Sequence, residues 1–131
     1  MQELGYETSL ETMRTQLRRY LTDEHSEIFV AVIGGDLVGV VSGHLIPALH
    51  EPGNIGRITA LVVAKKARSR RIASRLVNEL EKWFLKNRCL RFEVTSGKHR
   101  NAAHLFYESL GYAPAASRFL KAPQHNEDRL W

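Results

Sequence analysis

The feature that most constrains the fold is a change in the spacing of apolar residues along the chain, from strand-like to helical, near residue 69. Before it, three apolar segments rich in β-branched residues are separated by turn residues, which predicts successive strands at 28–33, 37–46 and 55–64. After it, apolar side chains recur at helical spacing: Ile72, Leu76, Leu80, Trp83 and Phe84. Three strands followed by one long amphipathic helix predict an α/β chain whose sheet is mostly antiparallel.

Capping and turn residues place the other elements. Thr8 and Glu11 form a T-x-x-E capping box, which predicts an amphipathic helix over 9–22. The run Gly34-Gly35-Asp36 predicts a hairpin turn between the first two strands. Beyond the long helix, the pattern predicts a strand at 89–96, a helix at 101–110 closed by Gly111, and a last strand pair or extended ribbon at 112–121.

The length of 131 residues suits one hydrophobic core, so we expect a single domain over 1–131 with a loose tail at 122–131. No basic stretch followed by an apolar run opens the chain, and no apolar run approaches the roughly 18 residues of a membrane span. We therefore expect a cytoplasmic protein without membrane association. The one cysteine, Cys89, falls in a predicted strand and is expected to be a structural thiol.

The charge of the chain is unevenly distributed. It carries 19 Lys and Arg residues against 14 Asp and Glu, a net charge of +5. Six basic residues crowd into one short stretch: Lys65, Lys66, Arg68, Arg70, Arg71 and Arg75. Such a cluster suits a nucleotide cofactor or a nucleic acid, although it is also typical of a solvated helix face. The cluster has no interleaved aromatic residues and no nucleic-acid motif, so we expect no nucleic-acid partner.

The position of this cluster indicates which anion it would bind. The strand that ends Leu61-Val62-Val63 leads through a short basic loop into the start of the long helix. Free backbone N–H groups and the positive end of the helix dipole face such a loop, which is the geometry that holds a pyrophosphate. The residues of this predicted phosphate cradle are Arg68, Ser69, Arg70, Arg71, Ile72 and Ala73.

Two motifs resemble those of the GNAT superfamily of N-acetyltransferases. The run 68–73 is similar to the signature Q/R-x-x-G-x-G/A, with Arg71 where the family has its middle glycine. The run 101–112 is similar to N-x-x-A-x-x-F-Y-x-x-x-G-F/Y, with His104 at the alanine position. From residue 103 onward the chain most resembles the branch that contains aminoalkylphosphonate N-acetyltransferases.

The resemblance implies a mixed, mostly antiparallel sheet flanked by helices, with acetyl-CoA as co-substrate. The pantetheine arm would pair like an added strand with the backbone of Leu61, Val62 and Val63. It would lie where this strand separates from the strand at 89–96. Asn101 would touch the coenzyme or cap its helix, and Tyr107 would protonate the leaving thiolate. The acceptor would be a primary amine of a small molecule.

The base that deprotonates the amine has several candidates. Members of this branch often carry a glutamate in the strand before Leu61, and the corresponding stretch 56–60 has no carboxylate. The nearby candidates are His44, His50 and Glu51, acting directly or through water. Two histidines without a third ligand at recognisable spacing do not predict a metal site, so none is expected here.

The departures from the family pattern leave alternatives open. We expect the Arg71 side chain to point away from the cradle and add charge, but it could instead lie across the cradle. A blocked cradle would fit the alternative function, a GNAT-like binding or sensor domain that has lost catalysis. Family members also have a strand and a helix ahead of the segment corresponding to 1–6. Without them the strand at 28–33 would be an apolar edge, so we expect a homodimer that covers this strand or the surface left bare by the missing helix.

Overall fold

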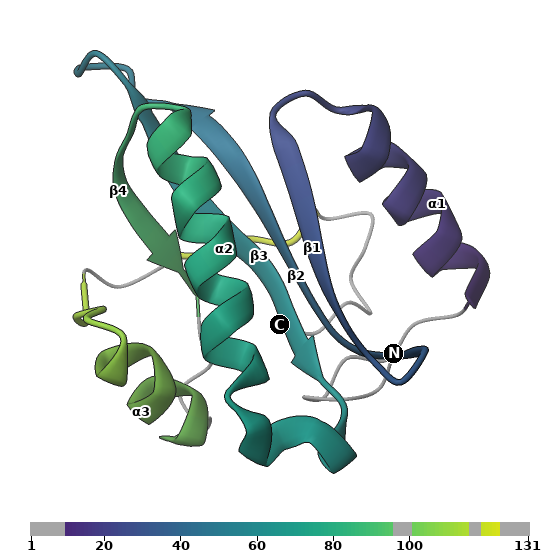
Figure 1. The fold of residues 1–131 in the computed structure, drawn as a ribbon. Helices are drawn as coiled ribbons and strands as arrows, with labels where there is room; N and C mark the ends of the chain where they lie inside the picture. The colour runs from purple at the N-terminus through teal and green to yellow at the C-terminus, as the bar shows by residue number, and fades with distance from the viewer. Residues whose placement is uncertain (1–9, 96–100, 116–118, 124–131) are drawn as a thin grey trace. The chain divides into compact units, whose positions relative to one another are not determined.

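Figure 1 shows the computed structural model of the chain, which describes residues 10–95, 101–115 and 119–123. The elements in chain order are α1 (Leu10–Thr22), β1 (Ser26–Ile33), β2 (Asp36–Pro47), β3 (Asn54–Val63), the 3₁₀ helix η2 (Lys65–Arg70), α2 (Ile72–Lys86), β4 (Cys89–Val94) and α3 (Asn101–Ser109). The helices and strands predicted up to residue 110 are all present. The chain forms two compact units, residues 1–100 with the sheet and residues 101–131 with α3.

The sheet has the strand order β1-β2-β3-β4. The strands β1, β2 and β3 pair antiparallel, and β4 pairs parallel to β3 after the α2 connection. The hairpin turn between β1 and β2 is formed by Gly34 and Gly35, whose φ values of 57° and 85° follow the pattern of a type I′ turn. The sheet is therefore mixed and mostly antiparallel, as predicted.

The helix α2 packs on one face of the sheet and supplies much of the core (Figure 1). Its buried side chains are Ile72, Leu76, Val77, Leu80 and Phe84. Two glycines let it approach closely, because a Cβ on Gly43 would lie 2.7 Å from Leu80 Cδ1 and one on Gly56 would lie 2.5 Å from the Phe84 ring. The contact of α2 with the sheet therefore depends on positions that carry no side chain.

The opposite face of the sheet carries more polar groups. Side chains alternate between the two faces along a strand, so the residues beside Gly43 and Gly56 point away from α2. These neighbours are Ser42, His44, Ile55 and Arg57, of which three are polar. Chemically active side chains of β2 and β3 therefore gather on the face that α2 leaves open.

The helix α1 contacts β1 and reaches this polar face through Tyr20. The Tyr20 hydroxyl donates to Thr59 Oγ1 at 2.8 Å, and the hydroxyls of Thr59 and Ser42 lie 2.7 Å apart. Among the described residues, α1 buries no side chain, and its exposed apolar residues are Leu10, Leu17 and Leu21. Thr8 of the predicted capping box lies outside the described residues.

The second unit contains α3 and the turn that follows it. Gly111 has a φ of 97° and donates its N–H to Glu108 O at 3.0 Å, so it ends the helix as predicted. The Tyr107 ring packs edge to face against Phe106 and Tyr112, with centroid distances of 5.1 and 5.6 Å. The prediction for 112–121 was a strand pair or an extended ribbon, and the strand pair is wrong, because the described residues of this stretch form no strand. The stretch is alanine-rich and includes Pro114, which cannot donate to a ladder.

Candidate active site

The place where β3 and β4 part is the most informative feature of the sheet. Their parallel pairing runs from Asn54 opposite Cys89 to Ile58 opposite Val94 (Figure 1). The strand β3 continues through 59–63 and pairs only with β2 there. Among the described residues no strand pairs with the other edge of this segment, so backbone N–H and C=O groups along it are available to a ligand, apart from Val63 O, which accepts a bond from Arg68 Nε.

A β-bulge marks the same place. Ser42 pairs with Ala60 and Gly43 pairs with Ile58, so Thr59 is an extra residue on β3. A bulge bends its strand and increases the local twist, which fits the separation of β3 from β4 at this point. The three predicted pantetheine-binding residues lie on the segment beyond the bulge, and their side chains are buried: Leu61, Val62 and Val63. Their side chains anchor the strand, while one backbone edge has no strand beside it in the part of the chain that the structure describes.

The predicted phosphate cradle is a 3₁₀ helix followed by α2, in place of the expected loop. The 3₁₀ helix η2 leads to Arg71, which is the N-cap of α2 and has a φ of 58° and a ψ of 23°. This left-handed conformation suits glycine and costs a residue with a Cβ about 1–2 kcal/mol. Arg71 therefore provides the backbone conformation that a glycine at this position would adopt.

The first turn of α2 is suited to bind an anion. Arg71 makes no side-chain capping bond, because a guanidinium has only donors. The N–H of Arg75 donates to Arg71 O at 3.2 Å, and the amides of Ile72, Ala73 and Ser74 before it have no acceptor within the helix. An anion placed here would meet these N–H groups and the positive end of the helix dipole.

Basic side chains surround this helix start. Arg68 Nε donates to Val63 O at 3.3 Å, which ties η2 to the end of β3. Lys66 Nζ lies 3.4 Å from Asp36 Oδ2, while the side chains of Arg71 and Arg75 are exposed. The side chains of Ser69 and Arg70, both in the predicted cradle, lie outside what the structure describes.

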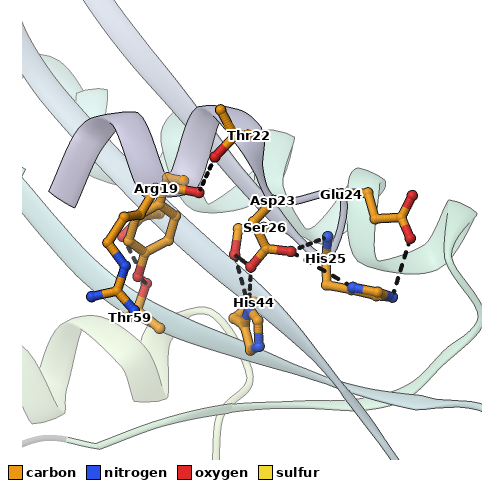
Figure 2. A network of polar contacts seen from close by, with 10 residues as sticks. Arg19, Thr22, Asp23, Glu24, His25, Ser26, His44 and Thr59 are labelled. Atoms are coloured by element: carbon orange, nitrogen blue, oxygen red, sulfur yellow. Dashed lines mark hydrogen bonds and ion pairs between the residues drawn. The ribbon is translucent and has the colours of Figure 1, made fainter. Parts of the chain in front are cut away.

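His44 lies on the face away from α2, at the junction of α1, β1 and β2 (Figure 2). Its Nδ1 is 2.8 Å from Ser26 Oγ, and Ser26 Oγ donates to Asp23 Oδ2 at 2.9 Å. The Asp23 carboxylate also accepts the backbone N–H of His25 at 2.8 Å. These hydrogen bonds hold the pKa of Asp23 below its usual value, and the bond from the His25 N–H has a larger effect than the bond from Ser26. An ionised carboxylate therefore anchors a network that ends at His44.

The other candidate bases lie apart from the unpaired segment of β3. Glu51 belongs to the loop between β2 and β3, where it accepts a bond from Arg91 Nη1 at 3.0 Å, and His50 is exposed in the same loop. This loop precedes Asn54, and a strand from there to Leu61 covers roughly 20 Å. His44 is nearer, because its register partner Arg57 is two positions from the bulge.

The structure places a carboxylate beside this site that the sequence analysis did not name as a candidate. Glu93 on β4 lies opposite Arg57, whose Nε donates to Glu93 Oε1 at 2.7 Å and whose Nη2 contacts the same oxygen. The stretch 56–60 has no carboxylate of its own, and its parallel neighbour supplies one. The register between the two strands brings these residues together, and no local pattern in the sequence reveals that register.

Two predicted site residues belong to the second unit. Asn101 is the first residue of α3, and Tyr107 lies in the same helix between the rings described above. Their roles toward the coenzyme stay predictions.

Other chemistries have little support in the described parts of the chain. There, no three His, Cys, Asp or Glu side chains gather closely enough to hold a metal ion. Within the same residues, every helix is too short or too polar to cross a membrane. Burial raises the pKa of the Cys89 thiol, which disfavours the reactive thiolate.

Comparison with known proteins agrees with this geometry. The acetyltransferase (GNAT) family model matches residues 2–112. The aminoalkylphosphonate N-acetyltransferase of Salmonella typhimurium strain LT2 is 30% identical over 119 residues, which cover 91% of this chain and 77% of that relative.

Solved structures share the fold. A transcriptional regulator from Bacillus halodurans C-125 is 25% identical with a TM-score of 0.76, and the match covers 86% of this chain and 75% of that one. The enzyme AAC(6')-Iy, solved with a bisubstrate analogue of CoA and acetylneamine, is 13% identical with a TM-score of 0.82. That match covers 93% of this chain and 85% of the other, and at this identity it shows the fold alone.

The family match spans most of the chain, and the mixed sheet with its parted β3 and β4 is the fold that the sequence motifs implied. The chain therefore belongs to the acetyltransferase (GNAT) family, whose enzymes take an acetyl group from acetyl-CoA.

Proposed function

We propose that the chain transfers an acetyl group from acetyl-CoA to the primary amine of a small molecule. The observation that carries this proposal is the unpaired edge of β3 over 59–63, which leads into the uncapped start of α2. The pantetheine arm contains amides that can bond to an unpaired strand edge as another strand would. The pyrophosphate is an anion that suits the N–H groups and dipole of a helix start.

The coenzyme would lie along residues of this chain in a defined order. Leu61, Val62 and Val63 offer backbone groups to the pantetheine arm, and a β3 amide near Val62 stabilises negative charge that develops on the thioester oxygen. The cradle 68–73 binds the pyrophosphate, with the Arg71 and neighbouring side chains adding positive charge. Asn101 is proposed as a further contact.

His44 is the proposed base and Tyr107 the proposed acid. Histidine changes charge near neutral pH, and His44 lies close to the bulge where β3 loses its β4 partner. Glu51 is not retained as a base, since it is paired with Arg91 at the other end of the strands. A phenol stays protonated at neutral pH, so Tyr107 can give a proton to the departing thiolate.

The name of the Salmonella typhimurium relative supports the choice of acceptor class. Short primary amines that carry a phosphonate are the first acceptors to test, beside matched amines without one. Release of free CoA thiol would measure turnover, and mass spectrometry would identify the acetylated product. We expect turnover with at least one amine of this panel and its loss in His44→Gln.

A binding or sensor domain without catalysis is the second candidate. It is favoured by the 25% identity to a transcriptional regulator and by Arg71 in place of the family glycine. The first candidate requires CoA to bind, which calorimetry measures, whereas a cradle obstructed by Arg71 would bind CoA weakly or not at all. Only the first predicts an acetylated product, so tight binding without product from any amine would favour the second.

We also propose a homodimer that forms through β1. This outer strand of the sheet has three exposed apolar side chains: Val30, Val32 and Ile33. Residues 28–33 of this strand include no charged residue and no proline, and such an apolar outer strand pairs readily with another copy. Light scattering at micromolar concentration should show a dimer that Val32→Lys converts to a monomer, whereas a monomeric wild type would contradict the proposal. A single domain over 1–131 and a cytoplasmic location are proposed from the sequence alone.

A further inference from the structure

The network that ends at His44 joins three segments of the chain. Asp23 lies in the turn after α1, Ser26 begins β1, and His44 is the register partner of Ser26 on β2. Figure 2 shows the three side chains pointing toward one another, with the Ser26 hydroxyl between the carboxylate and the imidazole. The Ser26 hydroxyl therefore links Asp23 to His44.

The single hydroxyl proton of Ser26 determines where His44 carries its own proton. The ionised Asp23 carboxylate can only accept, so the 2.9 Å contact requires Ser26 to donate to it. Ser26 Oγ is then the acceptor toward His44, and the 2.8 Å contact requires a proton on Nδ1. In a neutral imidazole with Nδ1 protonated, the lone pair is on Nε2. The His44 side chain is 40% exposed, which leaves it accessible to a substrate.

Several charged groups lie around His44. Asp23 Oδ2 lies 3.8 Å from Nδ1, and Glu24 lies in the same turn. Arg57, opposite His44 on β3, is neutralised by its ion pair with Glu93 of β4. The remaining titratable groups on this side are His25 of the turn, which is 3.6 Å from Asp23, and Tyr20 of α1.

We propose that Ser26 and Asp23 are positioning residues that hold His44 with Nδ1 protonated, so that Nε2 receives the proton of the acceptor amine. This inference rests on the proposed function, in which His44 is the base. As the amine nitrogen bonds to the acetyl carbonyl carbon, its proton passes to Nε2. The C–S bond breaks with its electron pair on sulfur, and Tyr107 protonates that sulfur. His44 then returns its proton to water, and Tyr107 regains one from water.

Ser26 is not a nucleophile in this arrangement. Its hydroxyl proton is hydrogen-bonded to the Asp23 carboxylate, which is too weak a base to remove it, and its oxygen accepts the Nδ1–H of His44, so the imidazole cannot activate it. The role of Ser26 is to hold the imidazole in a fixed orientation through its hydrogen bond to the Asp23 carboxylate.

Nitrogen-15 NMR of the full chain tests the tautomer. The neutral ring of His44, assigned by the loss of its signals in His44→Gln, should carry its proton on Nδ1. Ser26→Ala should move the proton to Nε2 or produce a mixture, while Ser26→Thr keeps a hydroxyl and should retain Nδ1–H. Ser42→Ala is the matched control, since Ser42 lies on the same face but bonds to Thr59, and the His44 tautomer should not change.

Kinetics provide the second readout. Ser26→Ala should lower kcat roughly tenfold, a part of the roughly 10²–10⁴ that a base contributes, with the KM for acetyl-CoA unchanged. Ser26→Thr should restore most of this loss. A wild-type His44 protonated on Nε2, or an unchanged tautomer in Ser26→Ala, would overturn the positioning role even if His44→Gln abolishes turnover. A protonated Nδ1 with full turnover in His44→Gln would overturn the base assignment and the positioning role with it.

Discussion

Two arginines flank α2 with left-handed backbones, Arg71 at φ 58° and Arg88 at φ 59°. This conformation costs a residue with a Cβ about 1–2 kcal/mol. Glycine avoids that cost. It also makes the unfolded chain more flexible, which lowers the free energy of unfolding by about 0.4–1 kcal/mol. We therefore expect Arg71→Gly and Arg88→Gly each to raise the free energy of unfolding by about 0.5–1 kcal/mol, a Tm increase of about 2–4 °C.

The two variants should differ in their effect on the coenzyme. Arg71 is the N-cap of the proposed pyrophosphate site, whereas Arg88 follows the other end of α2, where its carbonyl accepts the N–H of Asn54 at 3.0 Å. Calorimetry with CoA should show an unchanged or weaker affinity for Arg71→Gly, through the lost charge, and an unchanged affinity for Arg88→Gly. Arg71→Ala is the matched control, because it removes the charge and keeps the Cβ, so urea unfolding should show no stabilisation.

Two results would refute this reasoning. If Arg71→Gly tightens CoA binding tenfold or more, the arginine side chain obstructs the cradle and the sensor alternative gains support. If neither glycine variant is more stable than the wild type, the left-handed backbone carries no strain at these positions.

The remaining predictions concern packing, acid catalysis and thiol reactivity. Gly56→Ala should lower the free energy of unfolding by about 1–3 kcal/mol, because its Cβ would lie 2.5 Å from the Phe84 ring; an unchanged urea midpoint would show that the ring can move aside. Tyr107→Phe should lower kcat by roughly 10²–10⁴ without changing the CoA affinity, and normal turnover would end its assignment as the acid. Cys89, with its raised pKa, should react with an aromatic disulfide at pH 8 more slowly than free cysteine; an equally fast reaction would contradict its burial.

Local patterns in the sequence predicted most of the fold. The alternation in β1, β2 and β3 and the helical spacing of α2 are properties of neighbouring residues, so they can be read without knowing the contacts. The turn at Gly34 and Gly35 and the helix end at Gly111 were predictable for the same reason, since positive φ favours glycine. The stretch 112–121 lacked such a signal, and its predicted strand pair is wrong.

The candidate site was less predictable because strand register creates much of it. His44 was a candidate from its position in the chain, but its contact with Ser26 depends on the pairing of β1 and β2. Glu93 reaches Arg57 only through the parallel pairing of β3 and β4. The bulge at Thr59 likewise arises between two strands. The sequence therefore indicated the segments of the candidate site, but it could not indicate the side-chain pairs that form between its strands.

Hydrogen–deuterium exchange with and without CoA would test most directly whether the open edge of β3 and the start of α2 form the coenzyme site. Strand amides become protected when a ligand bonds to them, so exchange should slow over 59–63 and 72–74 when CoA is added. The strand β1 should change little and serves as an internal control. Binding of CoA that leaves exchange over 59–63 unchanged, or no binding of CoA at all, would contradict the proposed site.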